Sequence, residues 1–166
     1  MVGGPRAAYD AAEPAFQAMA SHVYWCGGSG SGTAIKLINQ LLVGIHTVAI
    51  AEAAVLGSRL GVNPQTLMEV LKTSYGSSTM LARNLPRFTR RDFGGGAPLR
   101  LMVKDIGLVQ REAAQVGIPL PMGIIAGRQF AAAAERGWAE EDFSSVVRIL
   151  EDAAGTTISG GSSSEP

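Results

Sequence analysis

The sequence predicts a mainly all-α protein built on one long helix, and three observations support that fold class. A continuous helical pattern covers residues 32 to 60, which as a single helix is about 43 Å long at 1.5 Å per residue. Helical patterns separated by glycine or proline fill the chain from Pro64 onwards. The β-prone stretch at residues 22 to 26 is short, and two short strands do not form a stable sheet alone.

The chain is long enough for one domain with a sizeable core, but it is short of charged residues. Hydrophobic residues make up 46% of the 166 residues and charged residues 17%, against about 25% charged in typical soluble domains. We therefore expect part of the surface to be covered by a partner subunit or a further domain. The formal net charge of zero argues against a nucleic-acid partner, which requires a basic face.

Cysteine, histidine and hydropathy exclude several further classes. The single cysteine, Cys26, excludes a disulfide framework and a cysteine-based metal site, and His22 and His46 show no ligand spacing, so no metal is expected. The N-terminus lacks a basic segment before an apolar core, so we expect no signal peptide and a cytoplasmic protein. The apolar run at residues 41 to 56 contains His46 and Glu52, which indicates a buried helix of a soluble protein and not a membrane span.

The first 27 residues predict the end of an α/β domain. Residues 5 to 20 read as a helix that starts at Pro5 and is strained by Pro14, and a short strand is expected on each side. Residues 1–27 are therefore interpreted as the remnant of a larger α/β domain. A helical domain is expected at 28–154, and the glycine- and serine-rich residues 155–166 are expected to form a flexible tail.

Start and stop signals place the helices that follow the long one. Asn63 is a good N-cap before Pro64, and Gly117 and Gly137 each end a helical pattern. Residues 88 to 96 contain three consecutive glycines and are expected to be irregular. The predicted helices cover residues 64–73, 79–85, 98–116, 121–136 and 142–153.

The glycine run before the long helix does not fit either phosphate-binding motif. A dinucleotide-binding turn that starts at Gly28 and Gly30 needs a third glycine where Thr33 stands. A P-loop needs lysine after Gly32, and the same threonine stands there. We interpret the run as an interdomain connection with glycines that allow close packing at the helix start.

Lys36 is the candidate catalytic residue, because it lies among apolar residues near two amides. At 100° per residue, Lys36, Asn39 and Gln40 share one sector of the helix. A lysine whose burial favours the neutral amine is suited to proton transfer, and adjacent amides hold a carboxylate or hydroxyl. The alternative is a lysine at a frayed helix start with its ammonium group in water.

Other polar residues inside apolar helices have plainer interpretations. Lys104 and Asp105 form a charged pair in the helix at residues 98 to 116, and a solvated edge accounts for them. Glu52 is expected to make a structural hydrogen bond, and His46 is expected to be a hydrogen-bonded core histidine.

Read together, these motifs resemble the β-hydroxyacid dehydrogenase family, which includes 3-hydroxyisobutyrate and threonate dehydrogenases. The run from Gly30 and Gly32 through Lys36 to Asn39 resembles the family's lysine motif. The sequence KDIGL at 104–108 resembles its lysine–aspartate helix, and DFSSV at 142–146 its last helix. Gln40 replaces the usual second asparagine, as in the threonate dehydrogenase branch. The resemblance covers roughly residues 1 to 153.

The resemblance implies the C-terminal helical domain of a 6-phosphogluconate dehydrogenase-like fold, preceded by the last strand–helix–strand of a Rossmann domain. It implies oxidation of the hydroxyl of a small hydroxy acid, with NAD or NADP bound mainly by a dinucleotide-binding domain. Lys36 would be the general acid/base, Asn39 and Gln40 would bind substrate, and Lys104 would contact the cofactor. The helical domain would pair into a homodimer or a dimer of dimers.

The sequence departs from the family because the cofactor-binding glycine fingerprint and the serine–glycine–glycine substrate loop are absent. We therefore expect the 166-residue chain alone to be inactive. Two alternatives stay open. One is a non-catalytic helical dimerisation or interaction module on the same scaffold, which has no need of Lys36. The other is a 6-phosphogluconate-type enzyme, which would want a histidine beside Asn39 and a basic phosphate pocket.

Overall fold

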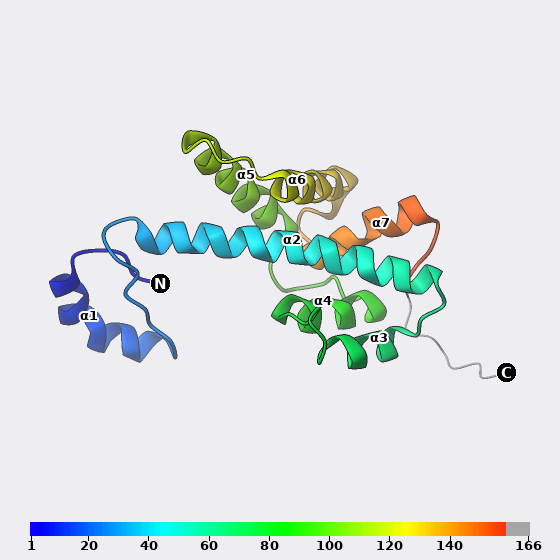
Figure 1. The fold of residues 1–166 in the computed structure, drawn as a ribbon, viewed down its shortest axis with the longest axis horizontal. Coiled ribbons are helices and arrows are strands. Elements are labelled where there is room, and N and C mark those ends of the chain that lie inside the picture. Colours follow the sequence, from blue (N-terminus) through cyan, green and yellow to red (C-terminus); the bar gives the residue numbers. More distant parts are fainter. Residues whose placement is uncertain (159–166) are drawn as a thin grey trace.

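A computed structural model describes residues 1–158 of the chain and shows a helical protein arranged around one long helix (Figure 1). Within that range, extended backbone is paired only at two isolated bridges, so the prediction of a mainly all-α fold is confirmed. The α-helices are α1 (Arg6–Met19), α2 (Ser31–Arg59), α3 (Pro64–Leu71), α4 (Thr79–Arg90), α5 (Leu99–Gln115), α6 (Pro121–Ala133) and α7 (Val147–Ala154). A π-helical turn (Ala134–Trp138) follows α6, and a 3-10 turn (Phe143–Val146) precedes α7.

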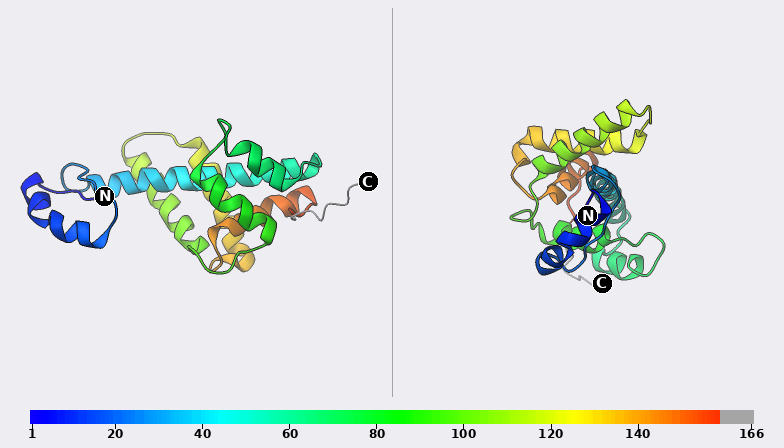
Figure 2. Two further views of the ribbon diagram at one scale, coloured as in Figure 1. Left: turned by 90° about the horizontal axis from the view of Figure 1, so that it is seen from below. Right: turned by 90° about the vertical axis from the view of Figure 1, so that its left-hand side faces the viewer.

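The N-terminal segment keeps the outline of a strand–helix–strand unit with very little strand. The Val2 amide donates to the Tyr24 carbonyl over 2.9 Å, and the Cys26 amide donates to the Val2 carbonyl over 2.8 Å. These bonds form a parallel bridge between Val2 and Trp25, so the strand expected at residues 22 to 26 is reduced to this bridge. The α1 helix runs through Pro14 and lies beyond the start of α2, away from the other helices (Figures 1 and 2).

The α2 helix is the axis of the fold, and only its second part is deeply buried. It packs against α4, α5, α6 and α7. Its buried residues are concentrated after Gly44, whereas Ile35, Ile38 and Leu42 are exposed. The first three turns of α2 therefore have exposed apolar side chains in this chain. By length and composition α2 could cross a membrane, a test that the core helix of a soluble protein also passes.

The core lies where α2 is crossed by α4 on one side and by α5 and α6 on the other. The α2 and α5 helices pack closely at Gly44, where a Cβ would lie 2.7 Å from Ile106 Cδ1 and 3.3 Å from Met102 Cε. The missing side chain lets the two helix backbones approach. The largest fully buried apolar side chains are Phe88, Phe130, Leu85, Leu99, Ile106, Ile158, Val146 and Val147.

The α4 helix is longer than the sequence predicts. The expected helix at residues 79 to 85 continues through Pro86 to Arg90, so the irregular region expected from Phe88 begins later. Proline removes one helical hydrogen bond, but Leu81, Leu85 and Phe88 lie on one buried face and their burial holds the helix together.

The last two predicted helices also differ in detail. The helix expected over residues 121 to 136 changes to a π-helical turn after Ala133, and Gly137 at φ 87° ends it. The helix expected over residues 142 to 153 begins as a 3-10 turn capped by the Asp142 side chain and becomes α-helical at Val147.

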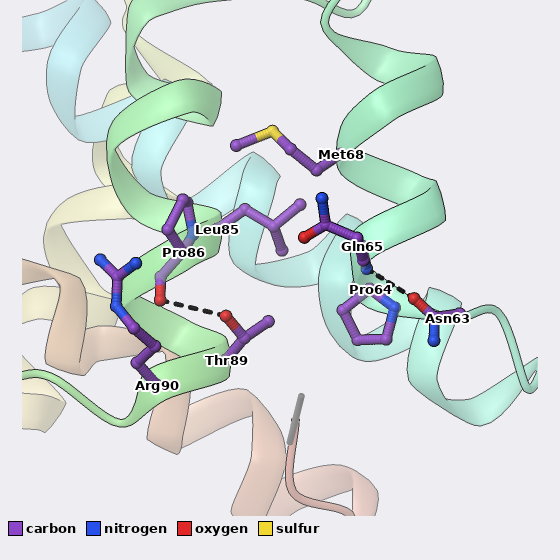
Figure 3. A pocket seen from close by; sticks show the side chains of 8 residues that line it. All are labelled: Asn63, Pro64, Gln65, Met68, Leu85, Pro86, Thr89 and Arg90. Atoms are coloured by element: carbon purple, nitrogen blue, oxygen red, sulfur yellow. Dashed lines mark hydrogen bonds between the residues drawn. The ribbon is translucent and has the colours of Figure 1, made fainter. Parts of the chain in front are cut away.

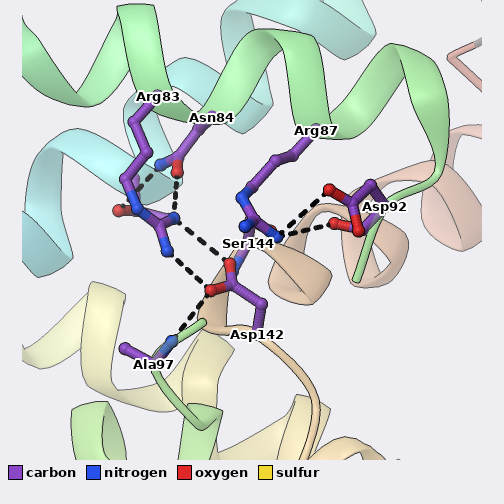
Figure 4. A network of polar contacts seen from close by, with 8 residues as sticks. Arg83, Asn84, Arg87, Asp92, Ala97, Asp142 and Ser144 are labelled. Carbon is purple, nitrogen blue, oxygen red and sulfur yellow. Dashed lines mark hydrogen bonds and ion pairs between the residues drawn. The ribbon is translucent and has the colours of Figure 1, made fainter. Parts of the chain in front are cut away.

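A buried polar network joins α4 to the loop before α5 and to the 3-10 turn (Figure 4). Arg83 makes a two-pronged ion pair with the fully buried Asp142, with bonds of 3.1 and 2.6 Å. Asp142 also accepts from the Ala97 and Ser144 amides over 3.1 and 3.0 Å. A Cβ on Gly96, whose φ is +78°, would collide with Asp142 Oδ2, so this loop position requires glycine.

A second buried carboxylate fixes the chain after α7. Glu151 accepts both bonds of Arg91, at 2.6 and 2.7 Å, and one from the Ile158 amide at 2.7 Å. Ile158 itself is fully buried. The start of the segment expected as a flexible tail, residues 155 to 158, therefore packs on the helical body, and the remaining residues 159–166 lie outside the described part.

Candidate active site

Three of the four candidate residues meet where α2 passes α5. The Gln40 amide donates to Asp105 Oδ2 over 2.8 Å, and the Lys104 ammonium lies 3.0 Å from Asp105 Oδ1. The Asn39 amide donates to Gln40 Oε1 over 3.2 Å. Asn39, Gln40, Asp105 and Lys104 therefore form one connected polar cluster, which we call the α2–α5 cluster.

Asp105 is the buried member of the α2–α5 cluster. Its side chain is 8% exposed, whereas that of Lys104 is 56% exposed. A buried carboxylate needs partners for both oxygens, and Asp105 has one on each side. Its neighbours on α5 include the apolar side chains of Met102 and Ile106, which are also buried. The carboxylate is therefore held in one orientation at the helix crossing.

Lys36 lies on the same face of α2, one turn before Gln40. The spacing of three and four residues places it beside Asn39 and Gln40 on the helix surface. Its side chain is exposed, and among the described residues no hydrogen bond or ion pair involves it. In this chain Lys36 is thus surrounded by solvent, and burial would have to come from another domain, a partner subunit or a ligand.

Asp105 was missed as a site residue by sequence reasoning. The interpretation of Lys104 and Asp105 as a solvated edge holds for the lysine alone, because Asp105, taken as a whole residue with its backbone, is only 5% exposed. The available signal was a carboxylate three residues after Met102 and four residues before Val109, which places it beside two apolar side chains on the helix surface. Helical spacing does not predict the partner of Asp105, because Gln40 lies 65 residues away in the sequence.

Three polar residues further along α2 are not part of this cluster. Thr47 is buried, donates to the Val43 carbonyl over 2.7 Å and accepts from Asn84 over 3.1 Å, so its role is structural. His46 is exposed, which makes the expectation of a core histidine wrong. Glu52 is exposed as well, and no hydrogen bond to it is found within residues 1–158.

Two cavities lie away from the α2–α5 cluster. An apolar groove of about 760 Å³ runs between the first turns of α2 and the end of α5 and is lined by Leu37, Ile38, Val109 and Ile118 among others. A hollow of about 420 Å³ lies between α3 and α4, beside the Asn63 cap of α3 (Figure 3). Neither lining includes any of the four candidate residues. Asn39 and Lys104 are exposed, so the cluster lies at the surface of the chain.

The side chains of the described residues can be compared with the needs of a metal ion and of a dinucleotide cofactor. Within residues 1–158 no group of three histidine, cysteine or acidic side chains is placed to hold a metal ion. A dinucleotide carries phosphates and an amide, which fit an exposed ammonium such as that of Lys104. The glycine run leads into α2 through Gly30 at φ 90°, and its spacing still excludes a dinucleotide turn.

Comparison with known proteins shows which family the chain is similar to. Residues 30–150 match the family model described as "NAD-binding of NADP-dependent 3-hydroxyisobutyrate dehydrogenase". The chain is 33% identical over 162 residues to 2-(hydroxymethyl)glutarate dehydrogenase of Eubacterium barkeri, covering 97% of this chain and 54% of that protein. It is 39% identical over 151 residues to L-threonate dehydrogenase of Cupriavidus necator, covering 90% and 51%.

Solved structures show the same fold. A 3-hydroxyisobutyrate dehydrogenase of Mycobacterium tuberculosis, solved with L-serine, superposes with a TM-score of 0.84 at 33% identity, over 90% of this chain and 54% of that one. The chain spans about half the length of the curated relatives it matches. From the family match and from relatives along nearly its whole length, the chain belongs to the 3-hydroxyisobutyrate dehydrogenase group of the β-hydroxyacid dehydrogenase family.

Proposed function

We propose that this chain supplies the helical catalytic part of an NAD(P)-dependent dehydrogenase that acts on the hydroxyl of a small hydroxy acid. Substrates of the 3-hydroxyisobutyrate, tartronate semialdehyde/glycerate or threonate type fit this proposal. The observation that supports it is the α2–α5 cluster. In it Gln40, which lies on the same face of α2 as Lys36, donates from its amide to Asp105 of α5 over 2.8 Å. A lysine and two amides at a spacing of three and four residues on one helix face can contact the same small ligand.

In the proposed reaction the substrate hydroxyl lies against Lys36. As the C–H bond breaks, the neutral amine of Lys36 takes the hydroxyl proton and the oxygen becomes the carbonyl of the product. The nicotinamide of the bound dinucleotide supplies the hydride acceptor. In the reverse direction the Lys36 ammonium returns the proton to the carbonyl oxygen. Lys36 therefore needs a dry surrounding, which the surface of this chain does not provide by itself.

Asn39, Gln40 and Lys104 hold the reactants in this proposal. Asn39 and Gln40 offer amide groups to the carboxylate or hydroxyls of the substrate next to Lys36. The exposed ammonium of Lys104 approaches the cofactor near its nicotinamide end, and its contact with Asp105 limits the positions it can take. The dinucleotide itself is held mainly by a separate glycine-rich domain, as in the family.

The exposed apolar surface supports a second part of the proposal, a homodimer or a dimer of dimers through the helical domain. Ile35, Ile38 and Leu42 on α2 are 41%, 59% and 49% exposed, and Ile124 and Ile125 on α6 are 41% and 47% exposed. Such a surface calls for a partner in a protein that is expected to be cytoplasmic, with no membrane or nucleic-acid partner. The same surface favours the alternative, a helical interaction module without catalysis.

The deciding experiment is an assay of the full-length product of the gene. With NAD+ or NADP+ and a panel of small hydroxy acids, reduced nicotinamide should form with at least one substrate. Lys36→Met should lower kcat by about 10²- to 10⁴-fold and leave cofactor affinity unchanged. Lys72→Met, at the exposed end of α3, is the control and should act as wild type.

Two outcomes would count against the proposal. If no hydroxy acid is oxidised with either dinucleotide, the interaction module is the better description. If Lys36→Met turns over as fast as wild type, an enzyme remains but Lys36 is not its proton-transfer group.

A further inference from the structure

Asp105 differs from the other buried carboxylates described in this chain. Asp142 and Glu151 each accept from an arginine and from backbone amides, so they tie loops to helices. Asp105 has two partners, the side chains of Lys104 and Gln40, and no backbone amide. The partners of the Asp105 carboxylate are therefore two candidate site residues.

We propose that Asp105 is a positioning residue that sets the direction of the Gln40 and Asn39 amides and the location of the Lys104 ammonium. The proposal deepens the dehydrogenase function above and rests on it. Asp105 contacts no substrate in this proposal and acts through the residues it holds.

The direction of the amides follows from the chemistry of a carboxylate. An ionised carboxylate only accepts hydrogen bonds, so Gln40 must turn its NH₂ group towards Asp105. The Gln40 carbonyl oxygen then faces Asn39, whose NH₂ group donates to it over 3.2 Å. An amide side chain is free to turn either end to a neutral partner, and Asp105 removes that freedom for both residues.

The two hydrogen bonds from Asn39 to Gln40 and from Gln40 to Asp105, which we call the relay, determine which polar atoms of Asn39 remain for a ligand. One N–H of Asn39 is used by Gln40, so its carbonyl oxygen and its second N–H remain for a ligand on the exposed side. A donor and an acceptor side by side match a hydroxyl group, which has both properties. A ligand with only acceptors, such as a second carboxylate, leaves the Asn39 oxygen without a partner. The relay therefore favours a hydroxyl at this position.

Packing alone does not explain a carboxylate at this point of the helix crossing. Asp105 lies next to Ile106, which contacts α2 at Gly44, and apolar side chains fill the crossing. Only the carboxylate of its ion pair with Lys104 is buried, and a carboxylate taken out of water in this way is usually no more stabilising than a well-packed apolar residue. The retained charge is accounted for by what it orients.

The test is a double-mutant cycle in the full-length protein with Asp105→Asn and Gln40→Met. If Asp105 acts through Gln40, Asp105→Asn should lower kcat by about 10- to 100-fold in the wild-type background. In the Gln40→Met background, at saturating dinucleotide, the same change should lower kcat by less than about 3-fold, because the contact through Gln40 is already broken and the loss of the Lys104 contact affects the KM for the dinucleotide. Glu140→Gln, which removes an exposed partner of Arg100 on α5, is the control and should leave kcat unchanged. Effects that multiply fully in the double variant would overturn the proposal.

A spectroscopic measurement separates this proposal from the dehydrogenase function. In protein labelled with ¹⁵N-glutamine and ¹⁵N-asparagine, Asp105→Asn should shift the side-chain amide resonances of both Gln40 and Asn39, and Glu140→Gln should not. If Asp105→Asn does not fold, Gln40→Met should still shift the Asn39 resonance, because Asn39 loses its acceptor. Unchanged Asn39 resonances would overturn the relay. Shifted resonances in a protein without dehydrogenase activity would overturn the function and keep the relay.

Discussion

The Gln40 amide on α2 donates to Asp105 on α5 over 2.8 Å, and this bond joins two candidate site residues from different motifs. Through it, the amide expected to bind substrate lies next to the carboxylate that holds Lys104, the lysine expected to contact the cofactor. One buried side chain, Asp105, therefore contacts both the residue proposed to bind substrate and the residue proposed to contact the cofactor.

Gln40→Asn shortens the side chain by one methylene and withdraws its amide from Asp105. We expect kcat/KM for the best substrate to fall about tenfold, which corresponds to about 1.4 kcal/mol of lost transition-state stabilisation. The preference among hydroxy acids should change as well, because the Asn39 amide loses its fixed direction. Steady-state kinetics on the substrate panel measures both effects. Gln65→Asn on the exposed side of α3 is the control, and an unchanged preference in Gln40→Asn would contradict the role of the bond.

Gly96→Ala should destabilise the fold much more than Gly95→Ala. Both glycines have positive φ, 78° and 67°, so each alanine carries a backbone cost of about 1–2 kcal/mol. Only at Gly96 does the added Cβ also collide with Asp142, whose ion pair with Arg83 is then displaced, at a further cost of about 3 kcal/mol. Urea unfolding of the two variants compares these costs directly. Equal free energies of unfolding would show that the loop moves away without disturbing Asp142.

The stability contributed by Asp142 should disappear in acid. Burial by itself raises the pKa of this carboxyl, but hydrogen bonds from Arg83 and Ser144 outweigh it, so the pKa lies below its ordinary value of 3.8. The unfolded chain therefore takes up the proton at higher pH than the folded chain does. The stabilisation is complete above about pH 5 and is lost as the pH falls through 3.8 towards the folded pKa.

This pH dependence is measured by urea unfolding of wild type and Asp142→Asn between pH 3 and 7. At neutral pH the variant should be less stable by about 2–4 kcal/mol, and the difference should shrink towards pH 3. Asp10→Asn, at an exposed ion pair on α1, should change stability by less than about 0.5 kcal/mol throughout. A difference between wild type and Asp142→Asn that is the same at pH 3 and pH 7 would refute the linkage.

Ile38→Lys should separate the proposed oligomer. Ile38 is 59% exposed on the apolar side of α2, and a charge there cannot be buried against a second copy without a partner. Light scattering coupled to size-exclusion chromatography should give a smaller mass for this variant than for wild type. Val70→Lys, 57% exposed on α3, is the matched control and should keep the wild-type mass. A wild-type mass for Ile38→Lys would place the subunit contact elsewhere.

Local sequence patterns predicted most of the helices but not all of their ends. The α2 helix, Ser31–Arg59, differs from the predicted 32 to 60 by one residue at each end, because its periodicity is long and unbroken. The α4 helix continues to Arg90, beyond the predicted end at residue 85, although Pro86 is a helix breaker by local rules. Burial of Leu85 and Phe88 outweighs that local preference, and burial is a property of the assembled fold.

The candidate site divides in the same way. Lys36, Asn39 and Gln40 share a helix face by a spacing of three and four residues, which the sequence alone determines. The partner of Gln40 was decided only by the tertiary structure. The α5 helix packs against α2 at Gly44, and this brings Asp105 Oδ2 within 2.8 Å of the Gln40 amide nitrogen. Exposure was decided there too: Lys36 and His46 point to solvent in this chain, although their neighbours in the sequence are apolar. Helical periodicity fixes angles along one helix, whereas the contact between two helices depends on how their side chains pack over long separations in the sequence.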